Sequence, residues 1–146
     1  MSRKIEIELE SVEIEEGNYH LFVIAKAGRK KARLLLDTGA SKTVFDSSQI
    51  ADFTGEKNKT HTTESVGLGA NKVETALFNL SSLNLGGLKI KGPEIALLDI
   101  SHVNMAYEMA GIPKIQGILG SDILMKTQAT IDYGKLKLKL KEIKNK

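Results

Sequence analysis

Both ends of the chain alternate apolar and charged residues with a period of two. Residues 5–9 read Ile-Glu-Ile-Glu-Leu, and residues 135–140 read Lys-Leu-Lys-Leu-Lys-Leu. Successive side chains point to opposite faces of a β-strand, so this period predicts two strands that each bury one apolar face. Because opposite charges on neighbouring strands stabilise one another modestly, we expect the two ends to pair, within one chain or between two chains.

The positive charge of the chain is confined to its C-terminal end. The net charge of the 146 residues is +3. Residues 135–146 hold six lysines and one glutamate, a charge of +5, which leaves −2 for the rest of the chain. With 5% aromatic residues and no Trp, this distribution argues against a nucleic-acid partner. We expect one domain over residues 1–146, with an acidic N-terminal strand region (1–16) and a basic C-terminal strand and tail (135–146).

The segments between these ends also predict mainly strands. Runs rich in aliphatic residues and bounded by turn residues occupy residues 20–27, 32–36, 73–80, 83–91, 94–100, 129–132 and 136–140. Helix patterns are short and cover residues 101–110, 121–128 and, more weakly, 45–53. Ser101 and Ser121 stand where N-cap residues are expected. The fold class is therefore predicted to be mainly β, with two or three short helices.

Several functional classes are excluded by residues that the chain lacks. It contains no Cys, which removes disulfides, thiol catalysis and Cys-ligated zinc. His20, His61 and His102 lie singly without the spacing of metal ligands, so we expect them to be structural or exposed and expect no metal site. No apolar run approaches the roughly 20 residues of a membrane span, and no leader-like apolar segment follows the first residues. A cytoplasmic location, without a membrane partner, is expected.

The segment that most suggests chemistry is Leu-Leu-Leu-Asp-Thr-Gly-Ala-Ser, residues 34–41. Three leucines predict a buried strand that stops at Asp37, Thr38 and Gly39. A carboxylate at the end of a buried strand is costly unless it is paired, hydrogen-bonded or protonated, and a glycine lets the backbone approach a neighbour closely. An ordinary Asp-Gly-type turn explains the same residues, and this segment alone leaves both interpretations open.

Two further glycine-containing segments follow along the chain. Ile118, Leu119 and Gly120 form a short apolar run that leads into the second helix pattern. Between this run and the Asp37 segment lies a glycine-rich stretch, residues 64–75, which has the composition of a hairpin tip. It fits neither the dinucleotide-binding motif nor the phosphate-binding loop. A mobile loop above a site, or a surface turn, accounts for it.

Taken in order, these segments resemble the retropepsin-like aspartic proteases, in particular their small single-domain bacterial members. The resemblance rests on Asp37-Thr38-Gly39 after a hydrophobic run, then the glycine-rich hairpin, then the apolar run that ends at Gly120, and it covers roughly residues 32–140. It implies a mainly β acid-protease fold, a closed bilobal-type barrel to which each chain contributes one lobe. It implies neither a metal nor an organic cofactor.

The resemblance also implies roles for individual residues. Asp37 would be the catalytic residue, with an active-site and substrate-binding loop formed by Thr38, Gly39 and Ala40. Thr38 would lock the two active-site loops together. The flap that closes over a peptide would consist of Gly67, Leu68, Gly69, Ala70 and Asn71. Support of the active-site loop would come from Ile118, Leu119 and Gly120. Two features depart from the family pattern: the spacing from Asp37 to Gly120 is longer than in the compact viral enzymes, and the flap holds fewer glycines.

Aspartic-protease chemistry needs two carboxylates that share one proton. No other aspartate is followed by Thr-Gly or Ser-Gly; the candidates are Asp46, Asp52, Asp99, Asp122 and Asp132. The chain is also short for two such lobes, so one Asp37 per chain predicts a homodimer about a two-fold axis. The resulting hypothesis is an aspartic endopeptidase acting on peptide or protein substrates. The alternative is a non-catalytic dimeric β module that binds extended peptides by strand addition.

Overall fold

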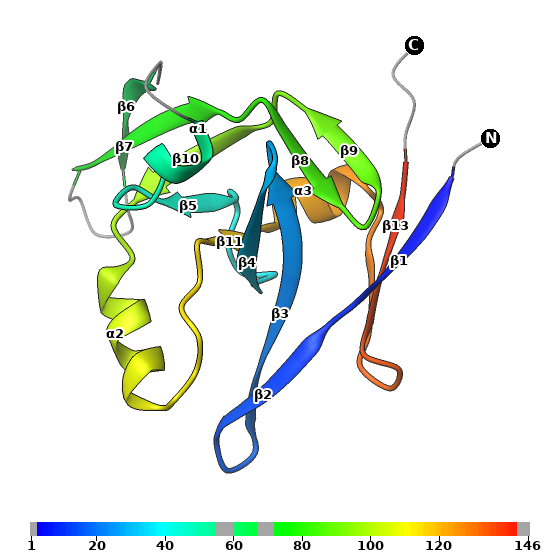
Figure 1. Ribbon diagram of the computed structural model, residues 1–146. Helices are drawn as coiled ribbons and strands as arrows, with labels where there is room; N and C mark the ends of the chain where they lie inside the picture. Colours follow the sequence, from blue (N-terminus) through cyan, green and yellow to red (C-terminus); the bar gives the residue numbers. More distant parts are fainter. Residues whose placement is uncertain (1–2, 55–59, 67–71, 143–146) are drawn as a thin grey trace.

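The computed structural model describes residues 3–54, 60–66 and 72–142, which form mainly strands with three short helices (Figure 1). The strands are β1 (Lys4–Glu8), β2 (Glu10–Glu15), β3 (Asn18–Ala27), β4 (Lys30–Leu36), β5 (Val44–Asp46), β6 (Thr60–Val66), β7 (Lys72–Asn79), β8 (Ser82–Leu85), β9 (Leu88–Lys91), β10 (Glu94–Leu98), β11 (Gly117–Leu119), β12 (Thr130–Asp132) and β13 (Lys137–Lys141). The helices are α1 (Ala51–Thr54), α2 (Ser101–Met109) and α3 (Ser121–Lys126). Among these residues, no helix has the length and apolar character needed to cross a membrane.

The larger of two sheets places strands from distant parts of the chain side by side. Its strand order is β6-β7-β10-β5-β11-β4-β3-β8-β9, and β2 pairs with β3. At its centre, β11 runs parallel to β4 and antiparallel to β5, and β5 runs parallel to β10. The β4–β11 register sets Gly117 opposite Leu34 and Leu119 opposite Leu36. The residue after Leu36 is therefore brought beside the residues that follow β11.

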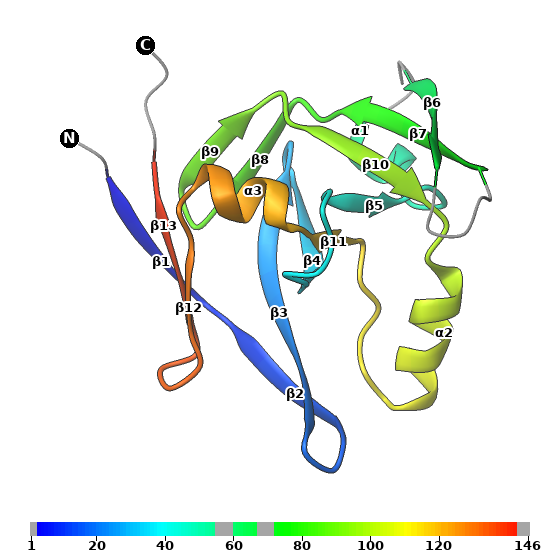
Figure 2. The same cartoon turned by 180° about the vertical axis from the view of Figure 1, so that it is seen from behind.

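The two ends of the chain pair with each other within the same chain. β1 and β13 are antiparallel, with Ile5 opposite Leu140 and Ile7 opposite Leu138, and β12 completes this three-stranded sheet. Figures 1 and 2 show this small sheet, with the first and last strands β1 and β13, beside the larger one. Ile5, Leu138 and Leu140 are buried in the main core. Of the two alternatives that the sequence left open, the structure has the pairing within one chain.

Two apolar clusters lie on opposite faces of β3. Leu21 and Val23 belong to the main core, whereas Phe22 belongs to a smaller cluster that also contains Ile115 and Tyr107 of α2. Neighbouring residues of a strand point to opposite faces, so the smaller cluster packs α2 against the face turned away from the main core. The position of α2 at one side of the sheet is visible in Figure 2.

The structure corrects the expectations about the helices at three points. Residues 45–53 are not one helix: Phe45 and Asp46 are buried in β5, and the helical turn begins only at Ala51. Pairing with strands on both sides outweighs the weak helix propensity there. Ser101 and Ser121 are first helical residues rather than caps, and neither helix has a side-chain cap.

The segments β6 and β11 were not expected to be strands, whereas β2 falls within the N-terminal strand region expected over residues 1–16. β2 pairs with β3 over residues 10–15, and β6 pairs with β7. β11 is only three residues long, and its pairing with β4 and β5 is what makes it a strand. The strands expected over residues 20–27, 32–36 and 94–100 are present with small shifts of their ends.

Two substitutions in β13 test whether apolar burial or charge pairing stabilises the sheet of β1, β12 and β13. Replacing Leu138, which has no exposed surface, by Ala should lower the free energy of unfolding by about 2–5 kcal/mol, because buried apolar volume is lost. Lys137→Ala, at the residue next to Leu138, breaks an exposed ion pair with Glu8 of β1 and should cost under about 1 kcal/mol. Urea unfolding of both variants measures the difference. Equal losses would mean that charge, rather than burial, holds the end strands.

Candidate active site

Asp37 lies directly after β4, at the point where the strand leaves the core. Leu34 and Leu36 are buried, Asp37 is partly buried, and the next residues, Thr38 and Gly39, are exposed. The N–H of Asp37 donates a hydrogen bond of 3.0 Å to the carbonyl oxygen of Leu119, so pairing between β4 and β11 continues one residue further. The backbone of Asp37 is thereby fixed by a segment more than 80 residues away in the sequence.

The turn after Asp37 donates a backbone hydrogen bond to the Asp37 carboxylate. The N–H of Gly39 donates a 2.9 Å hydrogen bond to Asp37 Oδ1, and the N–H of Ala40 donates one of 3.2 Å to the carbonyl oxygen of Asp37. A Cβ added at Gly39 would lie 3.3 Å from Asp37 Oδ1, tighter than an ordinary contact. Glycine therefore lets the backbone approach the carboxylate closely enough to bond to it.

A buried threonine fastens the Asp37 loop to the start of α3. Thr43 has no exposed surface; its hydroxyl accepts a 3.0 Å hydrogen bond from the N–H of Gly120 and donates one of 2.8 Å to Asp122 Oδ1. The N–H of Ser121 adds a 2.7 Å bond to the carbonyl oxygen of Ala40. The sequence analysis did not identify Thr43. Its position shortly after Asp37-Thr38-Gly39, at the start of a buried run, was the one signal that could have pointed to it.

The two glycines beside this contact permit the close packing of the backbone. A Cβ at Gly117 would lie 2.3 Å from the carbonyl oxygen of Val44, and one at Gly120 would lie 2.8 Å from that of Ala40. Real Cβ atoms do not approach backbone so closely, so a larger residue at either position would push the loops apart. The predicted support segment of Ile118, Leu119 and Gly120 thus contacts the Asp37 loop through Leu119 and Gly120.

The residues predicted to form a flap, Gly67, Leu68, Gly69, Ala70 and Asn71, lie outside the described residues. The strands on either side of them, β6 and β7, form an antiparallel pair whose register runs from Thr60 opposite Phe78 to Val66 opposite Lys72. This pairing is what a hairpin with its tip between Val66 and Lys72 requires.

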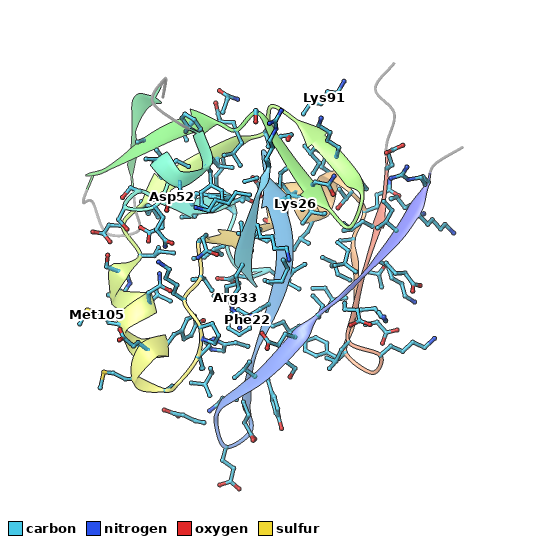
Figure 3. The ribbon with its side chains drawn as sticks, in the orientation of Figure 1. Phe22, Lys26, Arg33, Asp52, Lys91 and Met105 are labelled. Atoms are coloured by element: carbon cyan, nitrogen blue, oxygen red, sulfur yellow. The ribbon has the colours of Figure 1, made fainter. Side chains whose placement is uncertain are left out.

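The other aspartates have contacts of their own. Asp46 is buried and accepts hydrogen bonds from the N–H of Ser48 and the amide of Gln49. A hydrogen bond from the Ser101 hydroxyl lowers the pKa of Asp99, and the Lys135 N–H lowers that of Asp132. Asp122 is bonded to Thr43, and Asp52 is exposed on α1 (Figure 3). In the part of the chain that the structure describes, none of these carboxylates is hydrogen-bonded to Asp37.

A cluster of aromatic and polar side chains next to α2 was also not predicted from the sequence; it consists of His20, Phe22, Arg33 and Tyr107. His20 Nδ1 and the hydroxyl oxygen of Tyr107 are 2.8 Å apart, and the ring of Tyr107 packs edge-on against Phe22 at 5.6 Å between centroids. The guanidinium of Arg33 lies 4.1 Å from the centroid of Phe22, and the two residues lie together in Figure 3. These contacts join residues up to 87 positions apart, so no local pattern signals them. The described residues contain no cluster of three or more metal-ligating side chains.

Comparison with known proteins agrees with this geometry. The sequence model of the aspartyl protease family matches residues 23–123. The structure of a retropepsin-like aspartic protease from Rickettsia conorii is similar over 97% of this chain and 92% of that one, with a TM-score of 0.57 and 23% identity. EIAV protease complexed with the inhibitor HBY-793 is similar over 79% of this chain and 93% of that one, with a TM-score of 0.53 and 22% identity. No curated protein matches significantly. The fold is retropepsin-like.

The Thr43 contact predicts a measurable loss of stability on removal of a single hydroxyl. Thr43→Val keeps the shape of the side chain but leaves the buried Gly120 N–H without its acceptor, which should cost about 1–3 kcal/mol. Thr130→Val, on the exposed side of β12, is the matched control and should change stability little. Both are compared by urea unfolding. If Thr43→Val matched its control, the hydroxyl would not be what fastens the two loops.

Proposed function

The chain belongs to the aspartyl protease family, and on this basis we propose that it is an aspartic endopeptidase whose catalytic residue is Asp37. The observation that carries the proposal is the placement of Asp37. It lies within the matched region, at the end of a buried strand, with its backbone fixed by Leu119 and its carboxylate held by Gly39. A preorganised carboxylate at the surface of a rigid sheet is what activation of a water molecule requires.

The proposed active form is a homodimer. Peptide hydrolysis by this chemistry needs one carboxylate that accepts a proton and a second that donates one. In the described residues, four of the remaining aspartates hydrogen-bond to other groups, and Asp52 is exposed on α1. A two-fold axis close to Asp37 supplies the second carboxylate from a second copy of the chain.

In the proposed mechanism the two Asp37 carboxyl groups share one proton. The ionised carboxylate removes a proton from a water molecule as the water oxygen bonds to the carbonyl carbon of the peptide, while the protonated carboxyl donates to the carbonyl oxygen. The tetrahedral intermediate then breaks its carbon–nitrogen bond as a proton passes to the leaving nitrogen. Neither metal nor covalent intermediate takes part. Thr38, Gly39 and Ala40 are proposed to form the loop beneath the substrate.

Residues 67–71 are proposed as the flap above the substrate. They join β6 and β7, and β6 stands at the end of the strand order of the larger sheet. An end strand can accept an extended peptide by backbone hydrogen bonds, which also supports the alternative function, a dimeric module that binds peptides without cleaving them. Loss or retention of cleavage in an Asp37 variant separates these two functions.

Asp37→Asn should abolish peptide cleavage while leaving the fold intact. The amide keeps the size of the carboxylate and can still accept from Gly39, but it cannot accept the proton of water. Cleavage of a random peptide library by the purified protein, followed by mass spectrometry, measures this. Asp52→Asn, on the exposed face of α1, is the matched control and should cleave as the native chain does. Native turnover by Asp37→Asn would rule out the mechanism.

Mixing experiments test the homodimer. When native chain and Asp37→Asn are unfolded together in equal amounts and refolded, random pairing leaves about one quarter of the dimers with two aspartates. If both carboxylates are needed, activity per total chain should fall to about a quarter of the native value, and an active monomer would retain about half. An equal mixture of native chain and Asp52→Asn controls for refolding. A value of one half would overturn the homodimeric site.

A further inference from the structure

The β3–β4 register, continued beyond its last pair, sets His20 opposite Asp37 on one face of the larger sheet. The last pair in the β3–β4 register is Phe22 opposite Leu35. His20 precedes Phe22 by two residues, and Asp37 follows Leu35 by two. Because side chains two apart in an extended chain share a face, His20 and Asp37 continue the row that Phe22 and Leu35 begin. The continued register thus assigns a histidine to the face of the sheet that carries the proposed catalytic carboxylate.

The imidazole of His20 is held by a buried hydroxyl. Its Nδ1 lies 2.8 Å from the hydroxyl oxygen of Tyr107, and the two rings meet edge-on with centroids 5.8 Å apart. Tyr107 is 4% exposed, whereas His20 is partly exposed. A buried tyrosine locked by the ring of Phe22 therefore fixes the orientation of a partly exposed imidazole. Fixed polar groups of this kind confer specificity because they lose little freedom when a ligand binds.

Electrostatic interactions agree with this placement. The pKa of the Tyr107 hydroxyl lies above its ordinary value, and burial is the largest cause. The positive charge of Arg33 lowers this pKa, and the negative charge of Asp37 raises it. The hydroxyl that holds His20 therefore lies close enough to Asp37 to sense its charge. Arg33 itself forms an ion pair with Glu10 of β2.

Most of the remaining wall on this face is apolar; the guanidinium of Arg33, which packs on the ring of Phe22 and pairs with Glu10, is a charged group on the same face. Val12 stands opposite His20 in the β2–β3 register, and Leu35 and Ile118 are paired across β4 and β11. All three pack against the smaller cluster around Phe22. A largely apolar wall with a few oriented polar groups is the usual composition of a site that binds one side chain selectively.

We propose that His20, oriented by Tyr107, is a specificity-determining residue that hydrogen-bonds the substrate side chain next to the scissile bond. This inference rests on the proposed function, since a two-fold dimer would place one His20 on each side of the Asp37 pair. Both substrate residues that flank the cleaved bond are then selected. The favoured side chain carries an amide, because an amide both donates and accepts and so matches either tautomer of the imidazole. Tyr107 is a positioning residue.

Two peptides that differ only at the residues flanking the scissile bond test this selection. One carries Gln at both positions and the other Met, which has a similar length and shape but no hydrogen-bonding amide. The native chain should cleave the Gln peptide with a kcat/KM about five- to tenfold higher, the worth of one or two hydrogen bonds. His20→Leu and Tyr107→Phe should each bring the two values together, and His20→Gln should restore part of the preference.

Matched controls separate selection from general damage. His102→Leu, on the exposed first turn of α2, and Tyr19→Phe, exposed on β3 and adjacent to His20, should keep the native ratio. Thermal unfolding of each variant confirms that it is folded. The native chain could cleave the peptides with a ratio of kcat/KM values that neither His20→Leu nor Tyr107→Phe changes. That result would overturn the inference and leave the proposed function standing.

Binding to the Asp37→Asn protein provides a readout that needs no cleavage. The Kd of each peptide for this variant, alone and combined with His20→Leu, should show the same preference for Gln and the same loss of it. If the Asp37→Asn protein bound the Gln peptide more tightly but the native chain cleaved neither peptide, the role of His20 would be supported and the proposed hydrolysis overturned. If the Asp37→Asn protein bound neither peptide and the native chain cleaved neither, both proposals would fail.

Discussion

The insertion of β11 between β4 and β5 is the constraint on which the rest of the site depends. Only three residues long, β11 is parallel to β4 and antiparallel to β5, and Gly117 allows its backbone to approach Val44. Gln116 extends the contact: its side chain accepts from the N–H of Arg33 at 2.7 Å, and its own N–H donates to the Arg33 carbonyl oxygen at 2.9 Å. These bonds set the register that presents the Leu119 carbonyl oxygen to Asp37. A shift by one residue would remove that acceptor and turn the side chains of β11 to the opposite face.

The two faces of the larger sheet differ in composition and in the elements that they contact. The main core joins β3, β4 and β8 to the sheet of the chain ends, and its members are almost all aliphatic. The smaller cluster joins the other face to α2, and it includes Tyr107, whose hydroxyl lies within hydrogen-bond distance of His20. A polar group in the main core would cost stability without reaching substrate, whereas the same group beside the smaller cluster can be both fixed and partly exposed.

The sequence predicts those parts of the molecule whose signals are local. Period-two alternation locates β1 and β13, and Asp-Thr-Gly after three leucines locates the candidate catalytic residue. It misses β11 and β5, because strands of three residues are defined by their neighbours rather than by their own composition. It also misses the bonds from Thr43 to Gly120 and from Tyr107 to His20, which join residues 77 and 87 positions apart. Such contacts follow from topology, which a single sequence does not reveal.

The pairing of β1 with β13 restricts where a second chain can dock. Ile5, Leu138 and Leu140 are buried in the core of their own chain and Ile7 packs against it, so the apolar faces of these strands are already covered. What the small sheet leaves outside is mainly a row of opposite charges, including the Glu8–Lys137 pair, and exposed charge pairs stabilise an interface weakly. The proposed chemistry of Asp37, in contrast, would require the two-fold axis to pass close to its own loop. The stronger constraint on the proposed dimer therefore comes from the active-site loop, where Thr38 and Gly39 are exposed.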